Sequence, residues 1–365
     1  MHEDISLYTA QKKYPAERNI LLGYLHLTLI NPVMRIAING MGRIGRLLFR
    51  RLALHPEIEL VAVNDIMNRD NLAYLIKYDS VYGTYNSNLV MDGDSFVFDG
   101  KKIAVLQNEY PASLPWSAMK IDVVLECSGK FTNTGTAEQH INAGAKKILL
   151  STTGSADVPL MIYGFNQTSL TADMNIISPG GCMTNCCTPV LHILEAVGIV
   201  SAQLNILHSY TSRQELVDAP NKNFRRGRAA AESIIPVEID LHQSLERLIP
   251  GLHNKIAAVS TRVPVANGAM ADFTIQLNAK ISVAEINKLF KTAALHEYKG
   301  ILDYTEEQLV STDIKGNTHS CIIDGSLTSI VGNQLKLIAW FDNEYGFTSR
   351  MIDWLLYWKK GMVSG

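Results

Sequence analysis

The sequence contains no long hydrophobic run: nowhere do about 18 consecutive apolar residues occur, the length that a membrane-spanning helix needs. It also lacks a cysteine framework, because its five cysteines include no pair of C-x-x-C motifs. This use of cysteine fits a reducing compartment and argues against structural zinc. We therefore expect a cytoplasmic protein that has no membrane span and binds no metal.

An excess of positive charge is also missing. Lysine and arginine together number 33, and aspartate and glutamate number 35, so the net charge is −2. Proteins whose main partner is nucleic acid usually present a broad basic surface. The run Arg225-Arg226-Gly227-Arg228 is short, and such clusters usually make structural or subunit contacts. We expect no nucleic-acid partner.

The length of the chain predicts two domains, because 365 residues exceed what one hydrophobic core usually holds. A content of 47% hydrophobic and 19% charged residues is typical of a globular enzyme. Residues 1–33 stand apart from the pattern that follows. Their apolar stretch at 19–30 is interrupted by His26 and has acidic residues at its front, so we predict an N-terminal extension without a targeting role.

The clearest motif lies near residue 40. A β-rich run at residues 34–39 leads into Gly40, Gly42 and Gly45 at G-x-G-x-x-G spacing, and a helical stretch at 47–54 follows. In this fingerprint the first glycine permits a tight turn, the second lets a pyrophosphate approach the backbone, and the third lets the helix pack on the strand. We predict a dinucleotide site here.

A second strand at residues 58–63 ends at Asn64-Asp65. An acid about 25 residues past the first glycine accepts hydrogen bonds from ribose hydroxyls and repels a 2′-phosphate, so Asp65 favours NAD over NADP. Short apolar runs at 121–125 and 147–150 are typical of further parallel strands. Loops at the carboxyl ends of such strands bind ligands, and we expect Ser128 to line the cofactor site.

The pattern changes after Cys182. Runs at 203–208, 257–264, 272–277 and 334–341 are strand candidates, and residues 283–295 form a helical pattern. We predict an α/β protein with a Rossmann-type parallel sheet in residues 34–181. Residues 182–347 are expected to form an α+β catalytic domain with a mixed or antiparallel sheet. A helical stripe at 348–360 is expected to pack back on the first domain.

Cys182 stands between a Gly-rich loop and the start of an apolar helical pattern. A thiol at a helix N-terminus lies near the positive end of the dipole, so we expect a lowered pKa and a thiolate. The alternative is a buried structural cysteine. His208 lies at a predicted strand end and suits the base of a Cys–His pair, although a single histidine is more often structural.

Two more polar side chains follow predicted strands. Arg262 suits an anionic substrate group, with a salt bridge at the surface or an interface as the alternative. Asn343 carries both an amide donor and an acceptor, which suits a carboxamide partner. Its alternative is a turn residue, since Asn-x-x-Gly is common in turns.

Several stretches together resemble the glyceraldehyde-3-phosphate dehydrogenase family, in register from residue 34 to about residue 360, and the chain is also similar to the sister erythrose-4-phosphate dehydrogenases. They are residues 37–46, 77–80, 182–186, 208–211, 224–236, 262–264 and 340–346. The resemblance implies NAD-dependent oxidation of a phosphorylated sugar aldehyde through a cysteine thiohemiacetal and thioester, in glycolysis and gluconeogenesis. It also implies a homotetramer in which residues 213–233 reach a neighbouring subunit's cofactor.

Matching positions carry the family's roles onto this chain. Cys182 would be the nucleophile and His208 its base. Thr211 and Arg262 would hold the substrate's terminal phosphate, with Thr184 also in the substrate site. The cofactor site implied in the same way consists of Gly40, Gly42, Arg43, Ile44, Gly45, Asp65, Ser128 and Asn343.

Some positions depart from the family's usual pattern. Gly181 and Met183 stand where a serine and a threonine usually bind the attacking phosphate, and Ile239-Asp240 replaces a threonine–glycine pair. Two lost hydroxyls and one added carboxylate predict weak or altered phosphate binding. Arg213 replaces a usually acidic residue near the substrate phosphate. The open alternatives are an erythrose-4-phosphate dehydrogenase-like enzyme that uses water as acyl acceptor, and a catalytically weakened NAD-binding regulatory protein.

Overall fold

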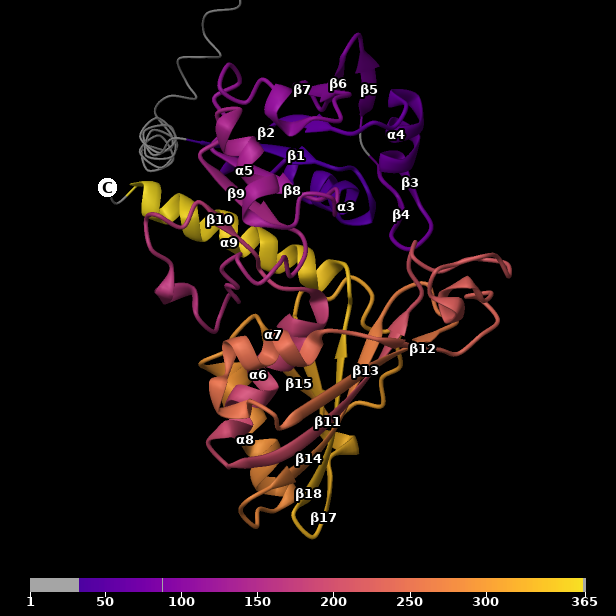
Figure 1. The fold of residues 1–365 in the computed structure, drawn as a ribbon, viewed down its shortest axis with the longest axis vertical. Helices are drawn as coiled ribbons and strands as arrows, with labels where there is room; N and C mark the ends of the chain where they lie inside the picture. The colour runs from indigo at the N-terminus through magenta and orange to yellow at the C-terminus, as the bar shows by residue number, and fades with distance from the viewer. Residues whose placement is uncertain (1–32, 87, 364–365) are drawn as a thin grey trace, which may run out of the picture.

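The computed structural model describes residues 33–86 and 88–363, so the predicted N-terminal extension lies outside the described residues except for Val33. Two β-sheets form the framework, one in the upper half of Figure 1 and one in the lower half. Helix α9 (Tyr345–Val363) lies where the two halves meet.

The first sheet contains the predicted parallel strands and ends in an antiparallel edge. Strand β1 pairs in parallel with β2 and β8, and β2 pairs in parallel with β7, whereas β6 pairs antiparallel with both β7 and β5. Strand β8 is buried along its whole length, which is typical of parallel strands covered on both faces. The strand order is β10 (Ile176–Ile177), β9 (Lys147–Leu150), β8 (Val123–Glu126), β1 (Met34–Asn39), β2 (Ile58–Asn64), β7 (Lys101–Leu106), β6 (Ser95–Phe98) and β5 (Leu89–Asp92).

The connections of this sheet create a ligand crevice. Strand β1 lies between β2, which follows it directly, and β8, which follows much later. The strand order therefore reverses beside β1, and open α/β sheets bind ligands at such a point, beyond the carboxyl ends of the strands. The remaining elements of this half are α3 (Arg43–Leu52), α4 (Arg69–Lys77), α5 (Thr134–Asn142) and the small pair β3 (Tyr78–Asp79) and β4 (Gly83–Thr84).

The second sheet is mixed. Strands β11 and β13 are parallel, while β14 and β18 run antiparallel to their neighbours, and β17 pairs only with β18. Helices α6 (Cys182–Glu195), α7 (Leu241–Leu248) and α8 (Val283–Leu295) pack against this sheet. The order is β12 (Ile235–Glu238), β13 (Ile256–Val263), β11 (Ile199–Ser209), β14 (Ala269–Leu277), β18 (Gln334–Phe341), β16 (Cys321–Asp324) and β15 (Leu302–Thr305), with β17 (Ser329–Val331) beside β18. The predicted fold class is confirmed.

Helix α9 belongs to the core of the first sheet. It begins at Tyr345, slightly before the predicted stripe at 348–360. Met351, Trp354 and Trp358 are buried in the same cluster as Phe49 of α3. The chain thus leaves the first half before α6 and returns after β18, so that the starts of α6 and α9 both lie at the junction.

Register brings two predicted site residues together at the end of the second sheet. His208 of β11 lies directly opposite Arg262 of β13, because these parallel strands pair from Ala202↔Ile256 onward without a shift. Helix α6 packs on the same sheet and starts at Cys182. The second sheet therefore places the thiol, the imidazole and the guanidinium at the carboxyl ends of β11 and β13.

Candidate active site

The three glycines of the fingerprint have different physical roles. Gly40 follows β1 with φ of +93°, and a Cβ there would lie 2.3 Å from the backbone nitrogen of Ser128, in the loop after β8. Gly45 lies inside α3, and its Cβ would lie 2.1 Å from the carbonyl oxygen of Gly40. A Cβ on Gly42 would meet no described atom within 4 Å. Of the three fingerprint glycines, only Gly42 therefore has open space where a Cβ would stand.

The start of helix α3 offers backbone donors to an anion. Gly42 is its N-cap and makes no side-chain capping hydrogen bond. The first intrahelical bond runs from the Arg46 N–H to the Gly42 carbonyl at 3.0 Å, so the N–H groups of Arg43 and Ile44 have no partner within the helix. These donors lie at the positive end of the helix dipole, which suits a pyrophosphate.

Asp65 lies at the end of β2, beside the fingerprint. Its carboxylate accepts the Met41 N–H at 2.6 Å and the Met67 N–H at 2.9 Å, and the side chain is half-buried. Each carboxylate oxygen retains further capacity to accept a hydrogen bond. Asp65 is thus oriented by the loop after β1 and remains able to receive ribose hydroxyls.

Glu126 organises the other side of the crevice. Its Oε1 accepts both the N–H and the hydroxyl of Ser128, at 2.7 and 2.5 Å. Its Oε2 lies 2.5 Å from Asn39 Nδ2 and 3.0 Å from His140 Nε2, and Trp116 donates to the other nitrogen of His140. Sequence reasoning missed this buried network, although an acid at the end of an apolar strand is an unusual feature.

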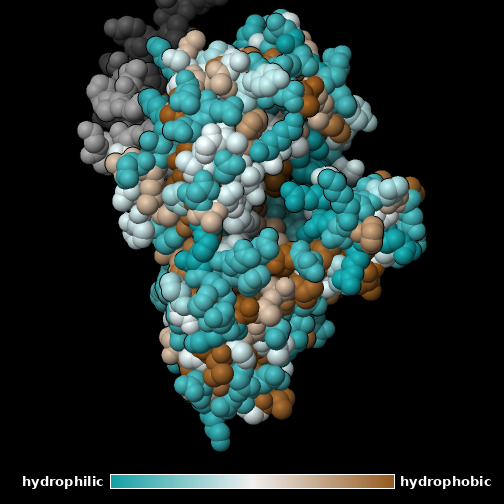
Figure 2. Space-filling view, viewed as in Figure 1, coloured by the Kyte–Doolittle hydropathy of each residue, from teal (hydrophilic) through white to brown (hydrophobic). Residues whose placement is uncertain are grey.

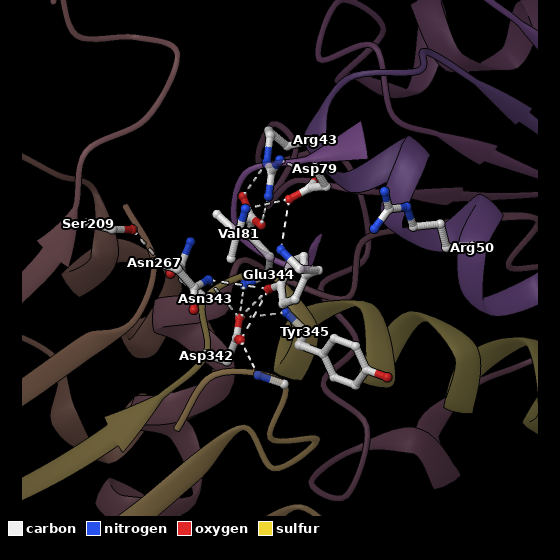
Figure 3. Close-up of polar contacts among 12 residues, drawn as sticks. Arg43, Arg50, Asp79, Val81, Ser209, Asn267, Asp342, Asn343, Glu344 and Tyr345 are labelled. Carbon is white, nitrogen blue, oxygen red and sulfur yellow. Dashed lines mark hydrogen bonds and ion pairs between the residues drawn. The ribbon is translucent and has the colours of Figure 1, made fainter. Parts of the chain in front are cut away.

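The side chain of Arg43 is engaged by two carboxylates. Its guanidinium binds Asp79 at 2.5 Å and Glu344 at 2.6 and 2.9 Å, and Figure 3 shows the three side chains converging. Burial opposes the charged form, but the two carboxylates outweigh it and raise the pKa of Arg43. Arg43 therefore offers an incoming anion its backbone N–H, while its charge joins the first half to the start of α9.

Asp342 is a hub at the same junction. This buried carboxylate accepts the Tyr82 hydroxyl at 2.9 Å, the backbone N–H groups of Glu344 and Tyr345, and the Gly316 N–H at 2.8 Å (Figure 3). Burial and the charge of Asp342 raise the pKa of Tyr82, so its hydroxyl keeps its proton. The hub was not expected from the sequence, and it fixes the turn that contains residue 343.

Asn343 is held through its oxygen. Its Oδ1 accepts the Gly268 N–H at 3.0 Å and the Ser209 hydroxyl at 3.2 Å. The Gly268 N–H and the Ser209 hydroxyl both donate, so the amide atom that they contact is the oxygen. The nitrogen Nδ2 therefore points away from these two partners. Asn343 lies in the turn as the alternative expected, and its Nδ2 is a donor of the kind that suits a carboxamide oxygen.

The thiol and the imidazole meet as predicted, with Cys182 Sγ 3.6 Å from His208 Nε2. Asn185, which sequence reasoning did not single out, donates to the carbonyls of Pro179 and Gly181 at 2.8 Å and so fixes the loop before the thiol. Thr184 lies buried in the first turn of the same helix. The start of α6 is thus rigidly tied to the preceding loop.

The expected lowering of the thiol pKa is wrong for this structure. Burial raises the pKa of Cys182 to about 11, although Arg262 and the N–H groups of Met183 and Cys182 itself act in the opposite direction. Burial also lowers the pKa of His208 to about 3, and the charge of Arg262 adds to this effect. Loss of hydration thus outweighs the helix terminus. At neutral pH the pair consists of a thiol and an uncharged imidazole.

Arg262 lies behind the imidazole and is buried. Its Nη1 is 2.6 Å from His208 Nδ1 and 3.2 Å from the Ser209 carbonyl oxygen, which also lies 2.8 Å from Nδ1. Burial lowers the pKa of Arg262, and the charges of Arg226 and Arg213 lower it further against the influence of Cys182. Three guanidinium groups therefore give this end of the sheet a positive potential that suits an anionic group.

Thr211 lies in the turn that follows β11. Its N–H and its hydroxyl both donate to Gln214 Oε1, at 2.8 and 2.9 Å. Figure 2 shows a hollow in the surface between the upper half of the molecule and the lobe formed by residues 213–233, which follow Thr211. Thr211 lies near the expected anion site, but both of its donors are already engaged by Gln214.

The described residues contain neither a metal-binding cluster nor a membrane-spanning helix. No group of three or more histidine, cysteine, aspartate or glutamate side chains among them is arranged to hold a metal ion. No helix in the described part of the chain has the length and apolar character needed to cross a membrane.

Comparison with known proteins assigns the family. The model of the glyceraldehyde 3-phosphate dehydrogenase NAD-binding domain matches residues 34–134, and that of the C-terminal domain matches residues 181–343. The chain is 40% identical to glyceraldehyde-3-phosphate dehydrogenase 2 of Bacillus subtilis over 323 residues, which cover 88% of this chain and 95% of the relative. It is 40% identical to glyceraldehyde-3-phosphate dehydrogenase 1 of Saccharomyces cerevisiae over 329 residues, covering 89% and 99%.

The chain belongs to the glyceraldehyde-3-phosphate dehydrogenase family. It is an NAD-dependent oxidoreductase of the glyceraldehyde-3-phosphate dehydrogenase type, with a glycolytic function. The crevice beside β1 fits NAD, because a Cβ on Gly42 would occupy space that is open in this dehydrogenase. The carboxylate of Asp65 suits a free ribose hydroxyl, and the amide nitrogen of Asn343 suits a carboxamide oxygen.

The different surroundings of the glycines generate a prediction. Gly42→Asp should lower NAD affinity at least about tenfold, because the carboxylate enters the pyrophosphate space. The free energy of unfolding should not fall, since aspartate is a favourable N-cap. Gly45→Ala should destabilise the fold through its overlap with Gly40. Titration with NAD and urea unfolding measure the two effects, and wild-type NAD affinity in Gly42→Asp would contradict the assignment.

Proposed function

We propose that this enzyme oxidises glyceraldehyde 3-phosphate, with Cys182 as nucleophile and His208 as base. The single observation that carries the proposal is the 3.6 Å separation of Cys182 Sγ and His208 Nε2 at the junction between the two halves. Asn343 lies on the adjoining turn, where its Nδ2 suits a nicotinamide carboxamide. Bound NAD supplies the hydride acceptor.

The proton of the thiol determines the first step. The base role requires the tautomer in which His208 Nδ1 donates to the Ser209 carbonyl, with Arg262 Nη1 donating to that same carbonyl rather than to Nδ1. Nε2 is then free to accept, and it faces the sulfur. His208 takes the thiol proton as the sulfur adds to the aldehyde carbonyl, which gives a thiohemiacetal. The backbone N–H of Cys182 lies at a helix N-terminus and suits the oxyanion. Charge is thus created in a buried site only when substrate is present.

The remaining steps release the acyl group. The oxyanion of the thiohemiacetal re-forms a carbonyl as its carbon loses hydride to the bound acceptor, and a thioester remains on Cys182 while His208 keeps the thiol proton. A second nucleophile then attacks the thioester carbonyl and expels the Cys182 thiolate. We propose that inorganic phosphate is this nucleophile, bound more weakly than in relatives that carry hydroxyls at positions 181 and 183.

A base variant tests the catalytic pair. His208→Asn should lower the rate of the first NADH burst by roughly 10²- to 10⁴-fold, because no group then accepts the thiol proton. NAD affinity should stay unchanged, since His208 is not part of the crevice beside β1. Rapid mixing of enzyme and NAD with glyceraldehyde 3-phosphate measures the burst. A burst at the wild-type rate would remove His208 from the mechanism.

Water is the second candidate acyl acceptor. The observations that favour it are the missing hydroxyls at Gly181 and Met183 and the exposed carboxylate of Asp240 at the start of α7. A Cβ on Gly181 would lie 3.6 Å from Thr153 Oγ1, an ordinary contact, so a serine fits there. The regulatory-protein alternative is less well supported, because the Cys182–His208 pair and Asn343 are intact.

The acceptor can be identified directly. With phosphate as acceptor, steady-state NADH formation should rise with phosphate concentration, and Gly181→Ser should lower the KM for phosphate by about tenfold through one added hydrogen bond to a charged group. Its KM for aldehyde should be unchanged. A rate indifferent to phosphate in both proteins would instead identify the hydrolytic, erythrose-4-phosphate dehydrogenase-like reaction.

We further propose that the enzyme is a homotetramer. The loop at residues 213–233 projects from the second sheet, and it exposes Leu216 by 69%, Val217 by 74% and Phe224 by 88%. Figure 2 shows hydrophobic surface on this lobe. Exposed apolar side chains of this size mark interaction surfaces. They support contact of this loop with a neighbouring subunit.

The mass of the purified protein in solution tests the assembly. Light scattering on the purified protein should give four times the 40.4 kDa of one chain, and Phe224→Asp should shift the mass downward. The variant puts a charge where an apolar contact is buried in the assembly. A monomeric wild-type protein would contradict the proposal.

The domain limits and the cellular location are two further proposals. We propose that residues 34–181 form the NAD-binding domain, that residues 182–347 form the catalytic domain, and that residues 348–360 return to the first. The separate core clusters of the two sheets support this division. The five cysteines are free thiols, which supports a cytoplasmic location, and recovery in the cytosolic fraction tests it.

A further inference from the structure

A chain of buried polar side chains joins the last residues of three neighbouring strands, β2, β1 and β8. Asn64 Oδ1 accepts the Asn108 N–H at 2.9 Å, and Asn64 Nδ2 donates to the Asn108 carbonyl at 2.9 Å. These backbone groups fix which end of the Asn64 amide is nitrogen. That nitrogen also donates to Asn39 Oδ1 at 2.7 Å, so Asn39 turns its own nitrogen toward Glu126, where Nδ2 lies 2.5 Å from Oε2.

His140 approaches Glu126 from helix α5, and its tautomer is fixed as well. The Trp116 indole N–H, which can only donate, reaches His140 Nδ1 at 2.9 Å. Nδ1 is therefore an acceptor, and the single ring proton of this neutral imidazole is on Nε2. Nε2 lies 3.0 Å from Glu126 Oε2 and donates to it. Trp116 and His140 are both fully buried.

Glu126 is therefore surrounded by donors. Its Oε2 receives Asn39 and His140, and its Oε1 receives both the N–H and the hydroxyl of Ser128. Four donors on two oxygens are the partners of an ionised carboxylate, because a carboxyl proton would itself need an acceptor. All four donors are uncharged, so they stabilise the buried carboxylate without cancelling its charge. A negative charge thus remains at the end of β8.

This charge lies on the nicotinamide side of the crevice. Asp65, which suits the adenosine ribose, follows β2, and the start of α3, which suits the pyrophosphate, follows β1. Strand β8 is on the other side of β1, so a dinucleotide extended across the strand ends places its second nucleoside toward β8. The charge also reaches beyond the network: burial raises the pKa of Cys127, the next residue, and the charge of Glu126 raises it further.

We propose that Glu126 sets the preference of the crevice for one redox state of the cofactor, favouring NAD over NADH. The nicotinamide ring of NAD carries a positive charge, whereas that of NADH is neutral, so an anion at the end of β8 attracts only the oxidised ring. Burial weakens the screening of such a charge by solvent and salt. Asn39, His140 and Trp116 are positioning residues that hold the carboxylate. The inference rests on the cofactor crevice and not on the Cys182–His208 chemistry.

Equilibrium binding of both cofactors to the full chain, without substrate, tests this role. Glu126→Gln removes the charge and keeps the size of the side chain. The ratio of the NADH Kd to the NAD Kd should therefore fall roughly 3- to 30-fold, the scale of one charge acting over a short distance through protein. Calorimetric titration measures the NAD Kd, and NADH fluorescence measures the other. A merely structural role would weaken both cofactors by the same factor and leave the ratio unchanged.

A matched control and a charge-restoring variant separate charge from structure. Glu138→Gln makes the same change at an exposed position of α5 and should leave both constants at wild-type values. Adding Asn39→Asp to Glu126→Gln returns a carboxylate to the network one strand away. Its oxygens can accept from the new amide, from Asn64 and from His140, whose Nε2 lies 3.4 Å from the atom replaced. This double variant should have a higher ratio than Glu126→Gln alone.

If circular dichroism shows that Glu126→Gln does not fold, Glu126→Ser replaces it. Water can then enter the vacated polar space and accept from the same donors, and the ratio should fall as it does for the glutamine. A wild-type ratio in every folded variant that lacks the charge would overturn the inference, and so would a double variant with the ratio of Glu126→Gln. Failure of the cofactor site itself is visible separately, because the wild-type protein would then bind neither cofactor.

Discussion

The proposed active site depends on one contact, between the sulfur that begins α6 and the imidazole that ends β11. The helix packs on the sheet through an apolar face, and its first turn is tied to the preceding loop by Asn185. Arg262 lies behind the imidazole because β11 and β13 pair without a shift. The position of each reacting group therefore follows from ordinary core packing, which fixes the site before any ligand binds.

Burial gives this contact its chemical character. The thiol and the imidazole are both neutral in the absence of substrate, since desolvation raises the pKa of Cys182 and lowers that of His208. A permanent ion pair would have to be stabilised in a site that excludes water. Under the proposed mechanism a neutral pair instead forms charge only while the thiol adds to an aldehyde, and the nearby arginines favour the negative partner. The same arginines attract an anionic substrate.

Contacts at the junction between the two halves also fix the turn that carries Asn343. Arg43 at the start of α3 binds Glu344, and Tyr82 binds Asp342, so the first half holds the turn that carries Asn343. Helix α9 continues from this turn into the core of the first sheet. An amide that suits the nicotinamide is thus held by both halves, which relates the cofactor crevice to the thiol by rigid contacts.

Much of this was accessible from the sequence. The glycine spacing, the apolar strands and the position of Cys182 before a helical run determined the fold class, the cofactor and the candidate nucleophile, because each is a local pattern with a local physical cause. The charge state of the thiol was not accessible, since it depends on burial contributed by distant segments. The Asp342 hub and the Glu126 network were missed for the same reason. Polar side chains reveal their role only when the fold decides which partners they meet and which atoms are left without one.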